Sequence, residues 1–288
     1  VLKKMKYADL HIHTNFSDST FSVMDVLDRA RKSGLSCIAI CDHDTVDALF
    51  VVENLAKKEE LHPHSLFIEE IEVIPAVELT CQNESRELHI LGYFIDYKDK
   101  DFLTVLKELK QQRRERIYEI SRKLGRLGIH IEPEEVFSLC PEGSSVGRLH
   151  VARVLLNKGI VSSFKDAFRR FIGERSPGYV ARFRFAPEEA ISIIKKAGGI
   201  PVLAHPHKSN CLNILPHLVD AGLEGIEVFY SDNTPAVEDF YKNLAAKYGL
   251  LVTGGSDCHG FAKKEILMGK VKLPYWYVEN MKERFLHS

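Results

Sequence analysis

Short apolar runs alternate with amphipathic segments over about the first and last hundred residues of this 288-residue chain. The apolar runs predict strands at 7–13, 37–41, 73–79, 88–95, 200–204, 225–229 and 250–253. Apolar residues three or four positions apart predict helices at 23–34, 46–58, 187–197, 212–221, 235–248 and 275–286. Strands that alternate with helices imply a parallel sheet covered by helices.

The middle of the chain follows a different pattern. One long charged helix is predicted at 102–128, shorter helices at 134–139, 150–157 and 164–172, and no strand. We therefore predict two parts, namely a barrel formed by 1–100 and 185–288 and a helical insertion, 101–184, that caps the strand ends. Residues 110–184 carry 16 lysines and arginines against 8 aspartates and glutamates, whereas the rest of the chain is acidic. A basic cap over an acidic body favours an anionic substrate, although a solvated helical surface has the same composition.

Polar groups follow almost every predicted strand. His11 and His13 lie two apart on a strand, so both imidazoles point to one face. The same residue types recur further along the chain as Asp18, His43 within Asp42-His43-Asp44, Glu78, His89, His205, Asp257 and His259. Parallel barrels and open α/β sheets place their sites at the carboxyl ends of their strands. Because nearly all strands contribute, a closed barrel is favoured over an open sheet, whose outer strand ends would lie too far apart.

These nine side chains are our candidate metal ligands. Asp9 lies deeper in its strand and is predicted to orient a histidine rather than to bind an ion. The alternatives are satisfied core histidines, above all for His89, and a helix N-cap for Asp44. Imidazoles and carboxylates without thiolates favour Mn²⁺, Fe²⁺ or Zn²⁺ over Mg²⁺ or a structural zinc.

Composition limits the remaining possibilities. No apolar run approaches the ~20 residues that cross a bilayer, and the basic start has no apolar signal region, so we predict a cytoplasmic protein. The six cysteines are scattered without a CxxC pair, which excludes an evident disulfide framework or thiolate zinc site. The net charge of −1 disfavours tight binding of long nucleic acid, and no stable binding of a duplex is expected. The chain also lacks an evident aromatic platform of the kind that stacks the bases of single strands.

The segments HxHT and SD, DHD, VE, HILGY, AHP and SDCHG occur in this order from residue 9 to residue 259. Together they resemble the PHP (polymerase and histidinol phosphatase) superfamily of metal-dependent phosphoesterases. The likeness is greatest to the branch with a helical insertion, which includes nucleoside 3′,5′-bisphosphate phosphatases and small exoribonucleases. It implies an α/β fold, a distorted (β/α)7 barrel, with two or three divalent ions.

The resemblance also implies a ligand set for each ion. His11, His13, Glu78 and Asp257 would hold the first, Glu78, His89 and His205 the second, and Asp18, His43 and His259 the third. Some family members have a histidine where this chain has Asp18, and a carboxylate there can change the metal preference of the third site.

Substrate contacts are predicted from two places. In the similar branch a GRPH-like segment helps to bind phosphate, and here Leu149 replaces its proline between Arg148 and His150. Arg148 offers a planar fork for phosphate, while the alternative is a surface arginine at a helix start. His207 and Lys208 follow the AHP segment and could reach substrate. Further candidates are Arg182 and Arg184.

The predicted reaction is hydrolysis of a terminal phosphate of a small nucleotide, such as a nucleoside 3′,5′-bisphosphate, by a metal-activated hydroxide. Arg148 would neutralise charge on the phosphate oxygens, and His207 or a bound water would protonate the leaving oxygen. The alternatives are a 5′→3′ exoribonuclease on short RNA and a histidinol-phosphate phosphatase. A non-catalytic module that serves a polymerase is disfavoured because the ligand set is complete, and a non-phosphate amidohydrolase is a more distant option.

Overall fold

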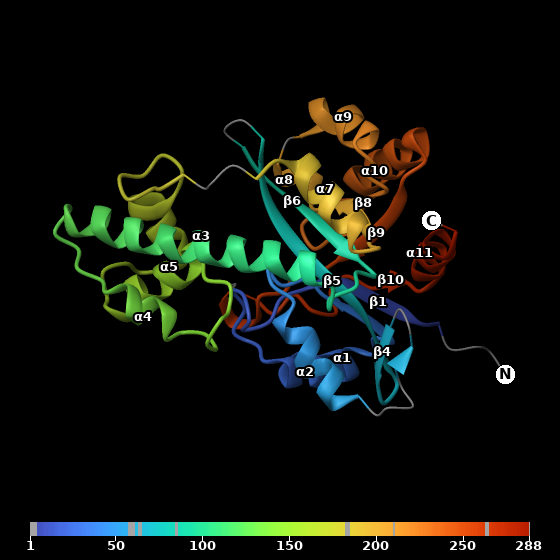
Figure 1. The fold of residues 1–288 in the computed structure, drawn as a ribbon, viewed down its shortest axis with the longest axis horizontal. Helices are drawn as coiled ribbons and strands as arrows, with labels where there is room; N and C mark the ends of the chain where they lie inside the picture. Colours follow the sequence, from blue (N-terminus) through green and yellow to red (C-terminus); the bar gives the residue numbers. More distant parts are fainter. Residues whose placement is uncertain are drawn as a thin grey trace.

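A ten-stranded sheet forms the body of the protein (Figure 1). The computed structural model describes residues 5–56, 61–62, 65–83, 86–181, 185–209, 211–262 and 265–287. The strand order is β10-β1-β2-β5-β6-β7-β8-β9, with β4 paired to β5 and β3 paired to β4. The strands are β1 (Tyr7–Ile12), β2 (Cys37–Ile40), β3 (Leu61–His62), β4 (Ser65–Ile68), β5 (Ile71–Asn83), β6 (Arg86–Tyr93), β7 (Ile200–Leu203), β8 (Gly225–Tyr230), β9 (Leu251–Gly255) and β10 (Leu273–Pro274).

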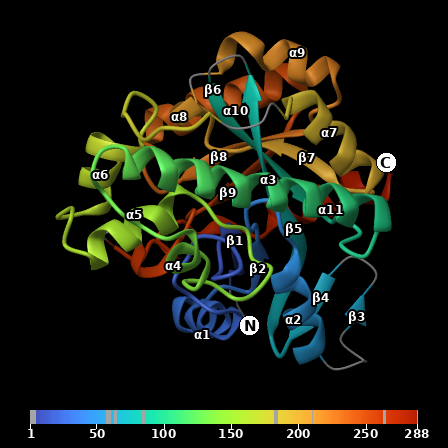
Figure 2. The ribbon, with the colours of Figure 1, turned by 60° about the vertical axis from the view of Figure 1, so that its left-hand side comes forward.

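The sheet curls until its two halves meet, which gives a nearly closed barrel (Figure 2). The segment after β9 lies along β1, where His13 N donates to Cys258 O at 3.1 Å and Asp257 N donates to His11 O at 2.8 Å. The barrel prediction is therefore confirmed. This closure brings the segment with His11 and His13, near the start of the chain, next to the segment with Asp257 and His259, near its end.

The prediction of a parallel sheet is wrong for β6. This strand pairs antiparallel with both β5 and β7, whereas β1-β2-β5 and β7-β8-β9 are parallel. Only residues 84–85 separate β5 from β6, and a parallel pair needs a crossover of a dozen or more residues. The strands were predicted at 73–79 and 88–95, and that wider gap concealed the hairpin.

Helices cover the outside of the barrel. These are α1 (Val23–Ser33), α2 (Asp47–Leu55), α7 (Pro187–Lys196), α8 (Pro206–Ser209), α9 (Leu215–Asp220), α10 (Pro235–Tyr248) and α11 (Trp276–Leu286), with short 3-10 turns at Leu212–Ile214 and Gly260–Ala262. The single helix predicted at 212–221 is thus a 3-10 turn followed by α9. Apolar faces of α1, α2, α7, α9 and α10 pack on the outer face of the sheet in the main core. A second core lies against α11, which contributes Val278 and Met281.

The middle of the chain is helical, as predicted, and extends from one side of the barrel (Figure 1). Its elements are α3 (Lys100–Gly125), α4 (Pro133–Phe137), α5 (Arg148–Asn157), α6 (Phe164–Ala167) and a π-helical turn at Phe168–Ile172. Ile120 and Leu124 of α3 pack with Val151 and Leu155 of α5 in a core of their own. The boundaries at 100/101 and 184/185 stay a prediction, since residues 182–184 lie outside the described residues. None of the described helices is both long and apolar enough to cross a membrane.

Candidate metal centre

One buried carboxylate, Glu78 of β5, lies among five imidazoles. Its Oε2 is 3.3 Å from His11 Nε2, 3.2 Å from His13 Nε2 and 3.1 Å from His43 Nδ1. Its Oε1 is 2.7 Å from His89 Nδ1 and 3.1 Å from His205 Nε2. The two oxygens therefore face two different sets of imidazoles, so Glu78 would be a ligand common to both sets if they held ions.

The hairpin explains how Glu78 and His89 meet. Thr80 of β5 pairs with His89 of β6, two residues beyond Glu78. Because β6 runs antiparallel, His89 reaches the site from the middle of its strand rather than from its carboxyl end. The site is thus built at one end of the barrel by strands of both directions.

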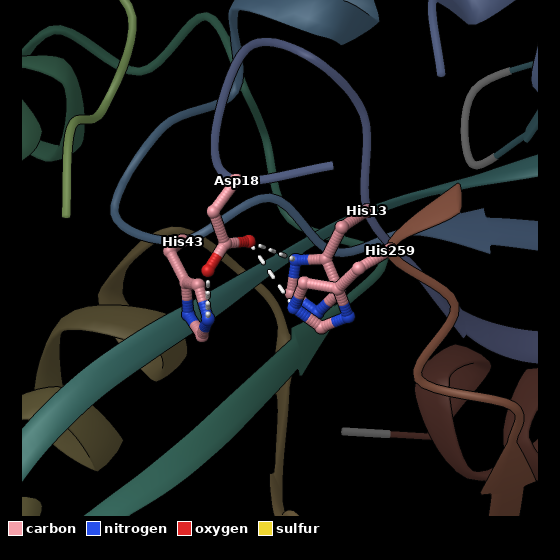
Figure 3. Close-up of side chains that lie close together, drawn as sticks. All are labelled: His13, Asp18, His43 and His259. Carbon is pink, nitrogen blue, oxygen red and sulfur yellow. Dashed lines mark ion pairs between the residues drawn. The ribbon is translucent and has the colours of Figure 1, made fainter. Parts of the chain in front are cut away.

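A second group surrounds Asp18 (Figure 3). Its Oδ1 is 3.1 Å from His259 Nε2 and 3.9 Å from His13 Nδ1, and its Oδ2 is 3.7 Å from His43 Nε2. The rings of His13 and His259 stack with centroids 4.2 Å apart. In Figure 3 the carboxylate of Asp18 faces His43 on one side and the stacked pair on the other. Asp257 joins both groups, since its Oδ1 is 3.2 Å from His13 Nε2 and 3.4 Å from His259 Nδ1.

All nine predicted metal ligands therefore lie together. Three sets of side chains have ligand atoms within 4.8 Å of one another: His13, Asp18, His43 and His259; His11, His13 and Glu78; and His43, Glu78 and His89. The sets overlap with the three ligand groups that the resemblance implies, although His205 and Asp257 fall outside them. The assignment of each ligand to a particular ion stays a prediction.

The donor atoms fit divalent cations. His11 Nε2 and His13 Nε2 lie 3.3 and 3.2 Å from Glu78 Oε2, yet these three buried atoms form no well-aligned hydrogen bond among the described residues. Buried polar atoms of this kind are costly unless another group satisfies them. Burial lowers the pKa of His43 to about 3, which leaves a neutral ring with a free lone pair. Burial alone would raise the pKa of Glu78, but the charges of His89 and His11 hold it well below its usual range, so a cation would meet a carboxylate.

A carboxylate that the sequence reasoning missed holds two of these histidines. Glu227 of β8 is fully buried, its Oε1 lies 3.0 Å from His11 Nδ1, and its Oε2 accepts from the His205 backbone N at 2.8 Å. The available signal was a lone glutamate within the apolar strand Gly225-Ile-Glu-Val-Phe. Ligating histidines regularly bond their second nitrogen to such a carboxylate.

Further buried acids hold the loops of the site. Asp42 accepts from Thr14 N at 2.7 Å and from Ser17 Oγ at 2.5 Å, which fixes the loop that carries Asp18. Asp9 accepts from Ser256 N at 2.8 Å, beside Asp257, and from the backbone N of His11 at 3.4 Å, so the predicted orientation of a histidine ring by Asp9 stays a prediction. Burial raises the pKa of Asp9 to about 6.

The backbone at this end of the barrel is unusual. Asp44, His205 and Asp257 have positive φ angles of 52°, 28° and 52°. Such conformations cost energy for residues other than glycine and cluster at functional sites. Each of these residues follows a strand, so the chain turns sharply where it presents a ligand.

Lys208 and His207 lie at one rim of the centre. Lys208 Nζ donates to the hydroxyl of Tyr230, which in turn donates to Asp257 Oδ2 at 2.5 Å. The rings of His207 and Tyr230 are 5.1 Å apart. Tyr230, at the end of β8, is the second site residue that the sequence reasoning missed, because only the fold brings it to Asp257.

Arg148 lies at another rim, at the start of α5. Its NH2 group is 3.3 and 3.4 Å from the two carboxylate oxygens of Glu87, and Glu87 Oε1 is 3.5 Å from His89 Nε2. The guanidinium carbon is 5.5 Å from the centre of the Phe168 ring and 5.7 Å from that of Tyr179. Arg148 is therefore not an isolated surface arginine, because it is linked to the centre through Glu87.

His150 is buried rather than open to substrate. Its Nδ1 accepts from the backbone N of Gly147 at 3.1 Å, and burial lowers the pKa of His150 to about 4. The structure thus gives it a local role at the start of α5 and places it beside the Asp18 loop. Arg182 and Arg184 lie outside the described residues.

Known proteins resemble this chain over nearly its whole length. The sequence profile of the PHP domain matches residues 9–173. The chain is 30% identical to a 5′-3′ exoribonuclease of Haemophilus influenzae, with 88% of this chain and 90% of that protein covered. It is 28% identical to a 3′,5′-nucleoside bisphosphate phosphatase of Chromobacterium violaceum, with 88% of each chain covered.

Solved structures agree with this similarity. A Bifidobacterium adolescentis protein classed as a metal-dependent phosphoesterase superposes with a TM-score of 0.83 at 27% identity, over 97% of this chain and 96% of that one. An amidohydrolase from Chromobacterium violaceum with bound sulfate superposes with a TM-score of 0.81 at 25% identity, over 96% of both chains.

Proposed function

Because the chain belongs to the PHP domain family and is a hydrolase of phosphate esters, we propose that its substrate is a small nucleotide with a terminal phosphate. A nucleoside 3′,5′-bisphosphate is the simplest example. The proposal includes two or three divalent ions, Mn, Fe or Zn, held by the nine residues around Glu78 and Asp18. The observation that supports these ions most strongly is the position of Glu78, whose two carboxylate oxygens face five imidazoles in two sets.

Ions in such a site polarise a phosphoryl oxygen and activate water at neutral pH. The protein groups bind and orient the ester. Arg148 offers two parallel N–H groups to phosphate oxygens, and a phosphate that reaches it would replace Glu87 as its partner. Lys208 adds a second positive charge on the other side, beside Asp257. Burial lowers the pKa of His207, so its ring is neutral and can form a hydrogen bond to the leaving oxygen, while the proton for that oxygen would come from a bound water.

A second candidate is 5′→3′ exonuclease action on short RNA at the same site. The similarity to exoribonucleases over most of both chains favours it. Both reactions require a phosphate group at the end of a chain or of a single nucleotide. They differ in whether a phosphate monoester or a phosphodiester is cleaved.

One screen tests the proposal. Mn²⁺-loaded protein is incubated with nucleoside 3′,5′-bisphosphates, short 5′-phosphorylated RNA, histidinol phosphate, circular single-stranded RNA and double-stranded DNA. We expect the fastest release of product from a bisphosphate or from the short linear RNA, and little from the duplex. Rapid cleavage of the circular RNA, which has no terminal phosphate, would disprove the terminal-phosphate proposal. Preference for histidinol phosphate over every nucleotide would overturn the substrate class.

A further inference from the structure

Arg113 of α3 joins the helical insertion to the barrel. Its side chain is only 7% exposed, although the arginine lies on a charged helix. Nε lies 2.6 Å from Asp44 Oδ2, NH2 lies 3.0 Å from Thr80 Oγ1, and NH1 lies 3.2 Å from the carbonyl oxygen of Val146. One guanidinium thus contacts three segments that are far apart in the sequence.

Two of these segments carry metal-ligand candidates. Asp44 follows His43 directly, and its backbone N donates to Glu78 O at 3.0 Å. Asp44 Oδ1 accepts from Thr80 N at 2.9 Å, and Thr80 Oγ1 lies 3.5 Å from His43 Nδ1. Arg113 therefore fixes the turn of His43 against the strand of Glu78.

The third segment leads into Arg148. Val146 is followed by Gly147, where an added Cβ would lie 3.3 Å from Arg113 NH1. This close approach favours a glycine there. Gly147 is the N-cap of α5 and Arg148 its first residue, so Arg113 contacts the chain directly before that helix.

We infer that Arg113 is a positioning residue that fixes Arg148 relative to His43, so that phosphate and ions meet at one place. The inference rests on the proposed phosphate contact of Arg148, but not on a nucleotide as the substrate. A lysine cannot replace this arginine, because a single ammonium cannot contact Asp44, Thr80 and Val146 in the planar arrangement of a guanidinium.

Chemical rescue tests the inference. A pocket of about 270 Å³ lies beside Arg113 and is lined by Asp44, Thr80 and Arg113 among others. In Arg113→Ala, free guanidinium ion can enter this pocket and bind Asp44. We expect kcat/KM to fall by about 10- to 100-fold, the usual effect of losing a group that orients a metal ligand. Millimolar guanidinium, far below denaturing concentrations, should recover part of that loss, whereas urea of similar size and no charge should not.

The controls separate positioning from general stability. Arg122→Ala removes an exposed arginine from the same helix and should keep wild-type kcat/KM with or without guanidinium. The double variant Arg113→Ala/Arg148→Ala should lose less than the product of the two single losses, because Arg113 acts through Arg148. The assay uses the ester that the wild type cleaves fastest, so failure of the nucleotide proposal leaves this test intact.

Several results would overturn the inference. The inference is wrong if Arg113→Ala folds and its kcat/KM stays within about twofold of wild type. It is also wrong if this variant folds and is impaired but guanidinium does not restore its activity. If Arg113→Ala does not fold, Arg113→Lys is measured instead. A loss of about tenfold supports the inference, and wild-type kcat/KM overturns it.

Discussion

The carboxylate of Glu227 lies 3.0 Å from Nδ1 of His11 and turns the opposite nitrogen of that ring toward Glu78. Burial alone would lower the pKa of His11, but Glu227 and Glu78 raise it well above its usual value. A cation between His11 and Glu78 would replace this proton. The proton and the ion therefore compete for the same nitrogen, and Glu227 fixes the tautomer that suits the ion.

Glu227→Gln should weaken metal binding by about 10- to 100-fold, because an amide is a poorer acceptor for the His11 N–H and stabilises the ligand less. Titration of chelator-treated protein with Mn²⁺ or Zn²⁺, followed by calorimetry, measures the change in Kd. Glu188→Gln, on the outer helix α7, is the matched control and should leave Kd unchanged. Equal affinity in the Glu227 variant and the wild type would contradict this role.

Glu78→Gln should lower kcat by more than about 100-fold, a larger factor than the loss of metal affinity expected for Glu227→Gln. The reason is that both carboxylate oxygens of Glu78 face candidate metal ligands. The fold should persist because the ligand is lost at the end of the barrel rather than in the apolar core, and the surrounding histidines can become neutral by releasing their protons. Elemental analysis gives the metal content, kcat gives the activity, and thermal unfolding gives the Tm. A variant that keeps its metal content and kcat would show that Glu78 bridges no ions.

Arg148→Ala should raise KM for phosphate esters while metal content stays unchanged. The loss of one charge-assisted hydrogen bond, worth about 1.5–3 kcal/mol, corresponds to roughly a 10- to 100-fold fall in kcat/KM. Steady-state kinetics and elemental analysis on the same samples test both parts. If kcat and KM equal the wild-type values, Arg148 does not bind the substrate and only pairs with Glu87.

The sequence predicts the candidate metal ligands better than it predicts the residues that hold those ligands in place. His11 and His13 are two apart on one strand, so their common face follows from the period of a strand. Glu227 gives no local pattern, because its partners lie 216 and 22 residues away in the chain. Arg113 is hidden in the same way, since it resembles the other charged residues of α3 until the fold brings it to Asp44.

The fold shows a similar division. Seven of the ten strands were predicted, but the four-residue strand β4 was missed, the ends of β5 and β6 were misplaced and their antiparallel pairing was missed. The two-residue strands β3 and β10 have too few positions for any periodicity. Their existence depends on pairing with neighbours, as β10 does with β1.

At the far end of the barrel, Glu72 binds α11. It accepts from Tyr275 at 2.5 Å and from Ser65 at 2.6 Å, and it pairs with Lys282 at 2.5 Å. Burial alone would raise the pKa of Glu72, but hydrogen bonds from Lys282, Ser65 and Tyr275 hold it below its usual value. The ionised form is thus favoured in the folded state.

Glu72→Gln should lower the free energy of unfolding by about 1–3 kcal/mol at pH 7. A depressed pKa contributes its stabilisation fully above the unfolded glutamate value, about 4.3, and loses it as the pH falls through the lower folded value. The difference between variant and wild type should therefore shrink below about pH 4. Urea unfolding with chelator present, from pH 7 to pH 3, measures it, with Glu279→Gln on the exposed face of α11 as control. A difference that is constant over this range would exclude the ionic contribution.

The closure of the barrel by the segment after β9 has a consequence for synthesis on the ribosome. His13 and Asp18 are synthesised before their partners Asp257 and His259, which follow some 240 residues later. Until then β1 has an open edge where residues 257–258 will lie, and open edges invite pairing with other chains. Completion of the metal site and protection of this edge therefore both wait for the end of synthesis. A ligand that binds only the folded chain adds no stability before that point. An interrupted chain would lack both, which makes it a ready target for proteolysis.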